Sequence, residues 1–356
     1  MSANIVFAAI LVLSLMGTVV SPEKFILPAY FVLGFPFILA VNIGFTIFWM
    51  VLRRWWFLLS LIVLLLASTE IKDTFPLNLG NNDQSVSDKK PITIMSYNTF
   101  VSCKLKKHKK NNPNMVVQHV LDVDPDILCL QEFVVSKKSE YITEEDYLRI
   151  LSKYKYHHIE YQLEESTKLV GIATFSKFPI VNKHKIEFDS YANLAIYTDI
   201  NINGKIVRLV NNHLESNRLT EKDKDMPMLL KDKLNAENLT LTTRHFSRKL
   251  GIAYKVRAHQ SDIVAEIIEN SPHSVICCGD FNDVPASYAY TRVKGRLTDA
   301  FSESGTGFGF TFHDRFYRFR IDYLMYDPKA FSLVDFQLGN SKYSDHYSVS
   351  CSLIVN

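Results

Sequence analysis

Three runs without a charged side chain fill most of the first 70 residues of this chain. Residues 2–22 and 25–52 contain no Asp, Glu, Lys or Arg, and residues 55–69 form a third such run that is dense in Leu, Ile and Val. A helix needs about 20 apolar residues to cross a hydrocarbon core of about 30 Å, so the second run is long enough to span and the third is short. We therefore expect a transmembrane region of about three helices over residues 1–70, held in a lipid bilayer.

The sidedness of the chain depends on the positive charges between these runs. Arg53 and Arg54 connect the second run to the third, and such pairs favour the cytoplasmic side of a membrane. Three spans would then place everything after residue 70 outside the cytoplasm, whereas two spans would leave it inside. A cleaved signal peptide over residues 1–21 is the alternative, but it lacks a positive n-region and a clear small-x-small cleavage site.

The rest of the chain is a nearly neutral domain behind a polar linker. Residues 71–91 are rich in turn-forming and polar side chains and are expected to form the linker, with the domain at 92–356. Residues 1–73 hold four of the 40 basic and three of the 37 acidic side chains of the chain. The remainder is therefore close to electrically balanced, which excludes a strongly basic nucleic-acid binder by bulk charge.

Alternating strands and helices are expected in this domain. A helix is predicted at 114–123, and a polar helical stretch of about 45 residues precedes residue 275. So many strands with helices interspersed indicate two packed sheets covered by helices. The expected strands are 92–97, 127–131, 156–161, 170–175, 180–188, 195–201, 205–211, 275–278, 321–325, 331–336 and 349–354.

The apolar strand at 275–278 leads directly into Gly279-Asp280-Phe281-Asn282-Asp283. Gly279 allows a sharp turn, and polar side chains at the carboxyl end of a strand lie where α/β proteins usually bind ligands. On its own the motif is weak. The plainer interpretation is a strand–loop–helix turn in which Asp283 or Ser287 caps the following helix.

Other strand ends carry similar side chains. Each of these, taken singly, is most simply a turn residue or a hydrogen-bonded polar group. Their joint occurrence at strand ends is what predicts a common site. The residues are Asn98, Glu132, His213, Asp280 and Asn282 after strands, Asp322 at the start of a strand, and Asp345-His346 immediately before the last strand.

At these positions the chain closely resembles the endonuclease/exonuclease/phosphatase superfamily, metal-dependent phosphodiesterases that include DNase I-like nucleases and neutral sphingomyelinases. The resemblance covers residues 92–356 and implies a four-layered α/β sandwich, two mixed β-sheets flanked by helices. Within the superfamily, the chain is similar to membrane-anchored bacterial members. That similarity would place the domain on the periplasmic side of an inner membrane. The matching stretches, in the family's order, are Ser96-Tyr97-Asn98, Leu130-Gln131-Glu132, Asn211-Asn212-His213-Leu214, Gly279-Asp280-Phe281-Asn282, Arg320-Ile321-Asp322-Tyr323 and Ser344-Asp345-His346.

The resemblance implies a Mg²⁺ site, with Mn²⁺ as a second possibility. Glu132 is the first choice of metal ligand, completed by Asn98 and Asp345, and Mg²⁺ prefers such oxygen ligands. The substrate is expected to be a phosphodiester, in a nucleic acid or a phospholipid headgroup, with Arg320 and Asn212 among its contacts. Nothing in the sequence points to an obligate protein partner.

The resemblance also implies an acid–base set. His346 is the expected general base, oriented by Asp322. Asp280 and Asn282 would position the attacking water and hold a phosphate oxygen, and His213 would donate a hydrogen bond to the phosphoryl group. The plainer alternatives are an ordinary strand-end histidine at 213 and a simple salt bridge from Asp322 to the nearby arginine.

One departure from the family pattern bears on the substrate. Several nucleases of the superfamily carry a Glu or Tyr that supports the phosphate-binding histidine, and the aligned position here is Leu169. That makes an endonuclease less secure and keeps a sphingomyelinase-like lipid phosphodiesterase open. The third interpretation is a catalytically inactive membrane scaffold, against which the retained cluster of like charges argues.

Overall fold

The computed structural model describes residues 1–78, 89–100, 106–218, 223, 236–314 and 317–356. The chain divides into two compact units. The helical unit comprises Met1–Thr74, Glu215–Ala265 and Asp283–Val293, and the sheet unit comprises Phe75–Leu214, Glu266–Asn282 and Lys294–Asn356. Residues 79–88 of the linker expected at 71–91 lie outside the described residues. The part before them is regular structure, because α5 ends at Thr74 and Leu77 pairs with Thr306.

The helical unit begins with a set of apolar helices. Among the described helices, only α1 is long and apolar enough to cross a membrane, at 18 residues, and α3 and α4 are apolar but shorter. The run expected as a single span over 25–52 is broken, because the chain turns at Gly34 and Pro36 starts a new helix. The helices are α1 (Ser2–Val19), α2 (Leu27–Val32), α3 (Phe35–Val51), α4 (Phe57–Leu66), α5 (Ser68–Thr74), the main part of α9 (Ala236–Glu269) and most of α10 (Tyr288–Lys294).

This bundle buries polar as well as apolar side chains, and many further apolar side chains are exposed on its outside. Asn42 on α3 donates to the carbonyl of Phe7 on α1, and Asn4 on α1 donates to the carbonyl of Trp56 and accepts from Ser60 on α4. All three polar side chains are fully buried. Leu11, Val32 and Phe35 are buried beside them, but so many exposed apolar side chains are unusual for a water-soluble bundle. Exposed apolar side chains include Ile5, Val6, Phe37, Ile43, Ile47, Ile62 and Leu65.

The sheet unit contains two six-stranded mixed sheets. The first has the order β13-β14-β1-β2-β4-β3 and the second β5-β6-β7-β8-β12-β9. In each sheet one central pair is parallel, β1 with β2 and β7 with β8. The strands are β1 (Ile92–Asn98), β2 (Ile127–Ser136), β3 (Tyr156–Glu164), β4 (Lys168–Ser176), β5 (Ile180–Ile186), β6 (Leu194–Ile202), β7 (Lys205–His213), β8 (Ser274–Asp280), β9 (Thr298–Asp299), β12 (Asp322–Tyr326), β13 (Phe331–Leu338) and β14 (Val349–Val355), with a small separate hairpin of β10 (Phe312–His313) and β11 (Arg318–Phe319).

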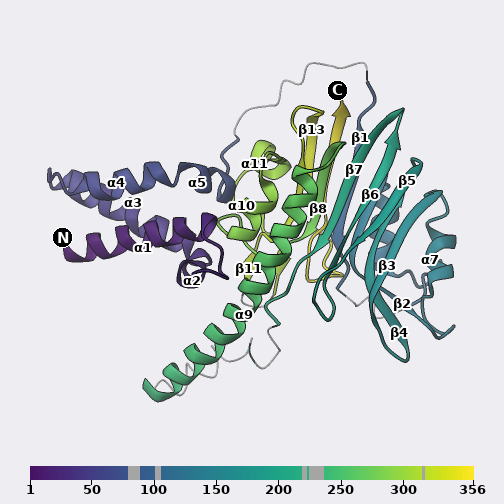
Figure 1. Cartoon of the computed structure of the whole chain (residues 1–356), viewed down its shortest axis with the longest axis horizontal. Coiled ribbons are helices and arrows are strands. Elements are labelled where there is room, and N and C mark those ends of the chain that lie inside the picture. The colour runs from purple at the N-terminus through teal and green to yellow at the C-terminus, as the bar shows by residue number, and fades with distance from the viewer. Residues whose placement is uncertain (79–88, 101–105, 219–222, 224–235, 315–316) are drawn as a thin grey trace. The chain divides into compact units, whose positions relative to one another are not determined.

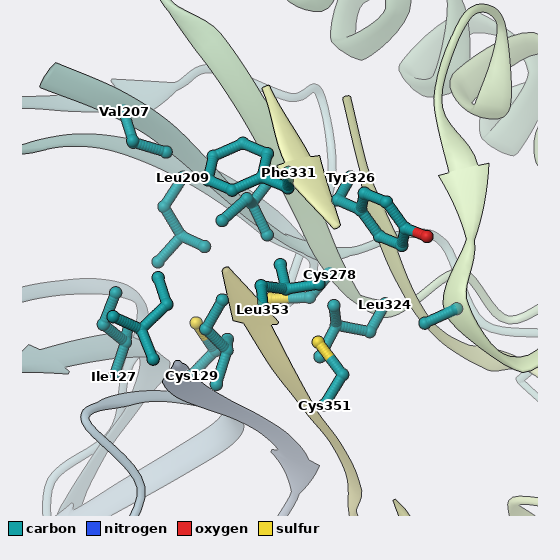
Figure 2. Close-up of a cluster of buried hydrophobic side chains, with 14 of the residues drawn as sticks. Ile127, Cys129, Val207, Leu209, Cys278, Leu324, Tyr326, Phe331, Cys351 and Leu353 are labelled. Carbon is teal, nitrogen blue, oxygen red and sulfur yellow. The ribbon is translucent and has the colours of Figure 1, made fainter. Parts of the chain in front are cut away.

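The two sheets pack face to face over one apolar core (Figure 2). Ile127 and Leu353 from the first sheet meet Leu209 and Leu324 from the second. Helices α6 (Met115–Val123) and α7 (Glu144–Ile150) cover the other face of the first sheet, and Figure 1 shows α7 beside β2 and β4. Val120 and Tyr147 are buried there with side chains of β1 and β2. α11 (Ala300–Ser304) contacts β12 and β13. The expected sandwich of two mixed sheets flanked by helices is confirmed.

Candidate active site

The strand registers of the second sheet bring three functional side chains together at the end of β8. Asp280, its last residue, pairs with His213 on β7 and with Asp322 on β12. Gly279 precedes it with a φ of +129°, and a Cβ there would lie 2.0 Å from the carbonyl oxygen of Asn212. Only glycine fits this close approach of β8 to β7. The glycine of the motif therefore has a structural cause independent of chemistry.

Asp280 is the centre of the site, and it is buried. Its Oδ2 lies 2.9 Å from Nδ2 of Asn98, 3.9 Å from Nε2 of His213 and 3.8 Å from Nε2 of His346. Its Oδ1 accepts a hydrogen bond of 2.8 Å from the backbone N–H of Asn282. The first sheet supplies Asn98 and the second supplies Asp280, so the site lies across the carboxyl ends of both parallel strand pairs.

His346 is held by Asp322, as the sequence predicts. Nδ1 of His346 and Oδ2 of Asp322 are 2.8 Å apart, and both side chains are buried. The alternative salt bridge from Asp322 is wrong, because Arg320 instead binds Asp299 at 2.6 Å. With Nδ1 committed to Asp322, the atom that faces the centre of the site is Nε2.

Glu132 lies inside β2 and not after it, which corrects the expected strand boundary. The pairing of β2 with β4 shifts between Leu130 and Phe133, and Glu132 has a φ of +48°. A β-bulge of this kind turns a side chain away from the ordinary pleat. Oε1 of Glu132 consequently lies 3.5 Å from Nδ2 of Asn98 and 3.8 Å from Nε2 of His213. Asp345, the third expected ligand, has Oδ1 3.9 Å from Nε2 of His346.

The electrostatics separate the two histidines. Burial lowers the pKa of His213 to about 3, assisted by the nearby charge of His346, so His213 is neutral. Burial also opposes the charge of His346, but the carboxylates of Asp322 and Asp280 outweigh it and raise its pKa to about 10. Burial raises the pKa of Asp280 and of Glu132, and neighbouring carboxylates add to both shifts. Such shifts concentrate at functional sites.

The side chains around this centre fit a divalent cation. Asn98, Glu132 and Asp345 offer amide and carboxylate oxygens, the donors that hard cations prefer. Asp280, Asp322 and His346 also form a buried group with candidate donor atoms within 4.8 Å of one another. Burial, and after it neighbouring carboxylates, raise the pKa of Asp280 and Glu132, and a bound cation would stabilise the charged form of both.

Two expected substrate contacts are not brought to this centre. Asn212 is fully buried, and its amide nitrogen contacts Sγ of Cys277 at 3.0 Å. Arg320 is buried against Asp299 and the ring of Phe301.

The side chain of Asn282 donates to the carbonyl of Leu214 at 2.9 Å, so it fixes the turn after β8. Ser287, and not Asp283, caps the following helix, through a bond from the N–H of Tyr290.

Two residues that support the site were missed by sequence reasoning. The hydroxyl of Thr311 accepts hydrogen bonds of 3.0 Å from the N–H groups of both Ile321 and Asp322. The hydroxyl of Ser344 donates to the carbonyl of Asn98 at 2.8 Å and accepts from the N–H of His346. Ser344 stands in a motif that the resemblance uses, whereas Thr311 lies in an aromatic stretch with no strand-end signal.

Comparison with known proteins identifies the family. The family model described as "Endonuclease/Exonuclease/phosphatase family" matches residues 95–346. The chain belongs to this family. A second family model, described as a domain of unknown function, matches residues 1–74. No curated protein matches the chain at a significant level.

Solved structures of the endonuclease/exonuclease/phosphatase family share its fold at low identity. The human Nocturnin catalytic domain with a bound sulfate anion has a TM-score of 0.53 at 18% identity, over 76% of this chain and 97% of that one. Danio rerio TDP2 complexed with a single-strand DNA product has a TM-score of 0.52 at 15% identity, over 74% and 99%. The 3′ phosphatase NExo from Neisseria, bound to a product DNA hairpin, has a TM-score of 0.50 at 16% identity, over 73% and 98%. The chain thus has the family's phosphoesterase fold.

Proposed function

We propose that this protein is a membrane-anchored, divalent-metal-dependent phosphoester hydrolase that acts on phosphodiesters. The observation that carries the proposal is the arrangement around Asp280, which lies 2.9 Å from the amide of Asn98 and 3.8 Å from Nε2 of His346. Asp322 holds the other nitrogen of His346, and Glu132 lies next to Asn98. Phosphoester hydrolysis needs an activated water and compensation of the charge on the phosphoryl oxygens. The arrangement supplies groups for both.

The residues of the chain divide the work as follows. Asp322 fixes the ring of His346 through Nδ1, so His346 exchanges a proton with the attacking water at Nε2. Asp280 accepts a hydrogen bond from that water and orients it. Neutral His213 donates a hydrogen bond to a phosphoryl oxygen as its charge increases.

The metal would be held by Glu132 with Asn98 and Asp345, and Mg²⁺ is the first choice over Mn²⁺. When bound, it supplies positive charge that polarises the phosphoryl group and compensates the surrounding carboxylates. Without a cation beside those carboxylates, His346 has a pKa of about 10 and keeps its proton. His346 can therefore accept a proton from water only when a cation balances the negative charge of the carboxylates.

A nucleic-acid phosphodiester is the first choice of substrate. Two fold relatives were solved with DNA, TDP2 with a single-strand product and NExo with a hairpin. A phospholipid headgroup is the second candidate, favoured by the apolar exterior of the helical unit, which would bring the site to a bilayer. A catalytically inactive scaffold has no use for a buried cluster of carboxylates.

The membrane part of the proposal rests on the many exposed apolar side chains of the helical unit. Apolar side chains on the outside with buried Asn and Ser hydrogen bonds between helices are typical of bundles packed in lipid. Asn4 contacts Trp56, so the N-terminus and Arg53-Arg54 lie at the same end of the bundle. By the positive-inside rule that end is cytoplasmic, which supports a multi-pass anchor with the sheet unit on the periplasmic side.

The test is hydrolysis by the purified full chain in detergent. Plasmid DNA and vesicles of sphingomyelin or phosphatidylcholine are each incubated with Mg²⁺ or with EDTA, beside a His346→Gln variant. We expect Mg²⁺-dependent nicking of DNA, lowered about 10²- to 10⁴-fold in the variant because a general base is lost. Release of lipid headgroups without nicking would establish the second candidate. Inactivity on both substrates, with no Mg²⁺ binding by calorimetry, would overturn the enzyme.

A further inference from the structure

A single exposed stripe on α9 carries basic and apolar side chains together. Its members follow one another at intervals of 3, 4, 4, 3 and 4 residues, which average the 3.6-residue repeat of an α-helix. They therefore lie along one line of the helix surface. The members, all exposed, are Leu241, Arg244, Arg248, Ile252, Lys255 and His259.

The stripe is held beside the apolar bundle, within the same helical unit. The hydroxyl of Tyr30 on α2 donates to the carbonyl of Ser247 at 2.8 Å, and the rings of Tyr30 and Tyr254 are 5.9 Å apart. Tyr254 also lines a small cavity with Gly17 at the end of α1. These contacts place α9 at the end of the bundle opposite to Asn4 and Arg53.

The stripe flanks the bundle and does not point away from it. The line of α9 that meets α2 runs through Ser247, Gly251 and Tyr254, and each is followed directly by a stripe residue. Consecutive residues of an α-helix are about 100° apart, so the stripe faces sideways from the contact. If the bundle spans a bilayer, that side is where the surrounding headgroups lie.

The basic side chains of the stripe form no ion pairs within the described part of the chain. Arg244, Arg248 and Lys255 form no ion pair with any described carboxylate, whereas the neighbouring Lys249 binds Asp223 at 2.5 Å. Exposed Ile252 stands between two of these cations on the stripe. A helix face with basic side chains around apolar ones is typical of segments that lie in a membrane interface.

We propose that the exposed stripe of α9 is a binding surface for anionic phospholipid headgroups. This inference rests on the membrane anchor of the proposed function and is independent of the catalytic chemistry. The three cations would contact headgroup phosphates while Leu241 and Ile252 enter the apolar boundary. A bundle in lipid would then also hold α9 on the membrane surface. The strength of this binding would increase with the negative charge of the lipid.

The test is hydrogen–deuterium exchange of α9 in the full chain reconstituted in vesicles. One set is phosphatidylcholine alone, and the other has one third of it replaced by phosphatidylglycerol. We expect exchange over 241–259 to slow roughly tenfold in the anionic vesicles and to recover in high salt. The triple variant Arg244→Glu/Arg248→Glu/Lys255→Glu should lose that slowing. The matched control Lys138→Glu/Lys155→Glu/Lys329→Glu, with the same change of net charge on exposed residues of the sheet unit, should keep it.

The outcomes separate this inference from the proposed function. Equal exchange in the two vesicle types, or slowing that survives in the triple variant, would overturn the lipid surface. Slowing produced by a single-stranded oligonucleotide in neutral vesicles, and not by anionic lipid, would overturn it in favour of nucleic acid. Carbonate extraction of the same vesicles tests the anchor, and release of the chain with the slowing retained would overturn the anchor alone. Hydrolysis is measured in parallel and can fail without affecting either result.

Discussion

Glu132 and Asn282, on either side of the site, hold left-handed backbone conformations with φ of +48° and +54°. Non-glycine residues rarely adopt them, and each costs about 1 kcal/mol or more. Such strain persists where the surrounding structure enforces it. At Glu132 the bulge in β2 does so, and at Asn282 the bonds to Asp280 and Leu214 do so. The unfavourable conformations therefore lie where the carboxylates are positioned.

At Gly279, substitution by alanine is expected to prevent folding of the sheet unit. A Cβ there would lie 2.0 Å from a backbone oxygen, which no rotamer change relieves. We expect a loss of more than about 4 kcal/mol, seen as aggregation or an absent thermal transition. Gly204→Ala is the matched control, because Gly204 also has a positive φ of +92° but has open space around it. That variant should fold with a loss of about 1–2 kcal/mol, and similar behaviour of the two variants would contradict the steric argument.

Arg257 offers a second test at the residue scale, in the helical unit. Its fully buried guanidinium binds Asp283 at 2.7 Å, Asn217 at 2.7 Å and the carbonyl of Glu215. Arg257→Met would remove the buried cation that binds the carboxylate of Asp283 and is expected to cost about 3–5 kcal/mol. Thermal unfolding in detergent measures this. Arg257→Met/Asp283→Asn should recover part of the loss, and a double variant as unstable as the single one would refute the charge explanation.

The structure brings most of the predicted site residues together, and strand geometry explains why the others lie elsewhere. Asn98, Asp280 and His346 converge because strand ends meet at one edge of each sheet. The prediction for Asn212 was not met because successive side chains of a strand point to opposite faces. A site-facing His213 therefore puts Asn212 on the other face of the sheet, where its amide contacts Cys277. The prediction that Arg320 contacts the substrate was not met because Arg320 binds Asp299. Asp299 belongs to β9, a two-residue strand that the sequence pattern does not reveal.

At the scale of elements, the strands were predicted by their apolar runs, but the bulge and the pairing were not. A bulge depends on how β2 meets β4, and that register is a tertiary property. The second apolar run, residues 25–52, was predicted as one span from its length. The chain instead turns at Gly34, with Pro36 in the first turn of the next helix, and forms the two helices α2 and α3.

His158 on β3 makes the stability of the sandwich depend on pH. Burial, with the charges of Lys183 and His184, lowers its pKa from 6.5 to about 4, and its Nδ1 bonds Thr198 on β6 of the other sheet. Above pH 6.5 neither state binds a proton there, so the contribution is complete. Between pH 6.5 and 4 the unfolded state binds more protons, and stability falls as the pH falls.

Thermal or denaturant unfolding at a series of pH values measures this contribution. The decline between pH 6.5 and 4 should be shallower in a His158→Gln variant than in the natural protein. Identical slopes would show that other groups carry the acid sensitivity.

At the scale of the whole molecule, the sequence predicted a simple succession of anchor, linker and catalytic domain. The compact units follow a different division, because 215–265 and 283–293 group with the N-terminal helices. These segments leave the sheet unit next to Leu214 and Asn282, directly after β7 and β8. Periodicity along a sequence does not show which distant segments pack together, so this division was not predictable. The helical unit therefore includes the segments that follow β7 and β8.

The most direct test of the account is a Mg²⁺ titration of the full chain, followed by both thermal unfolding and phosphodiester hydrolysis. A cation that binds the folded state raises the melting temperature, so both signals should rise over the same range of concentration. Glu132→Gln should shift both to higher Mg²⁺, while Glu160→Gln, on β3, should change neither. Hydrolysis that persists in EDTA, or a Glu132→Gln variant that titrates like the natural protein, would contradict the account.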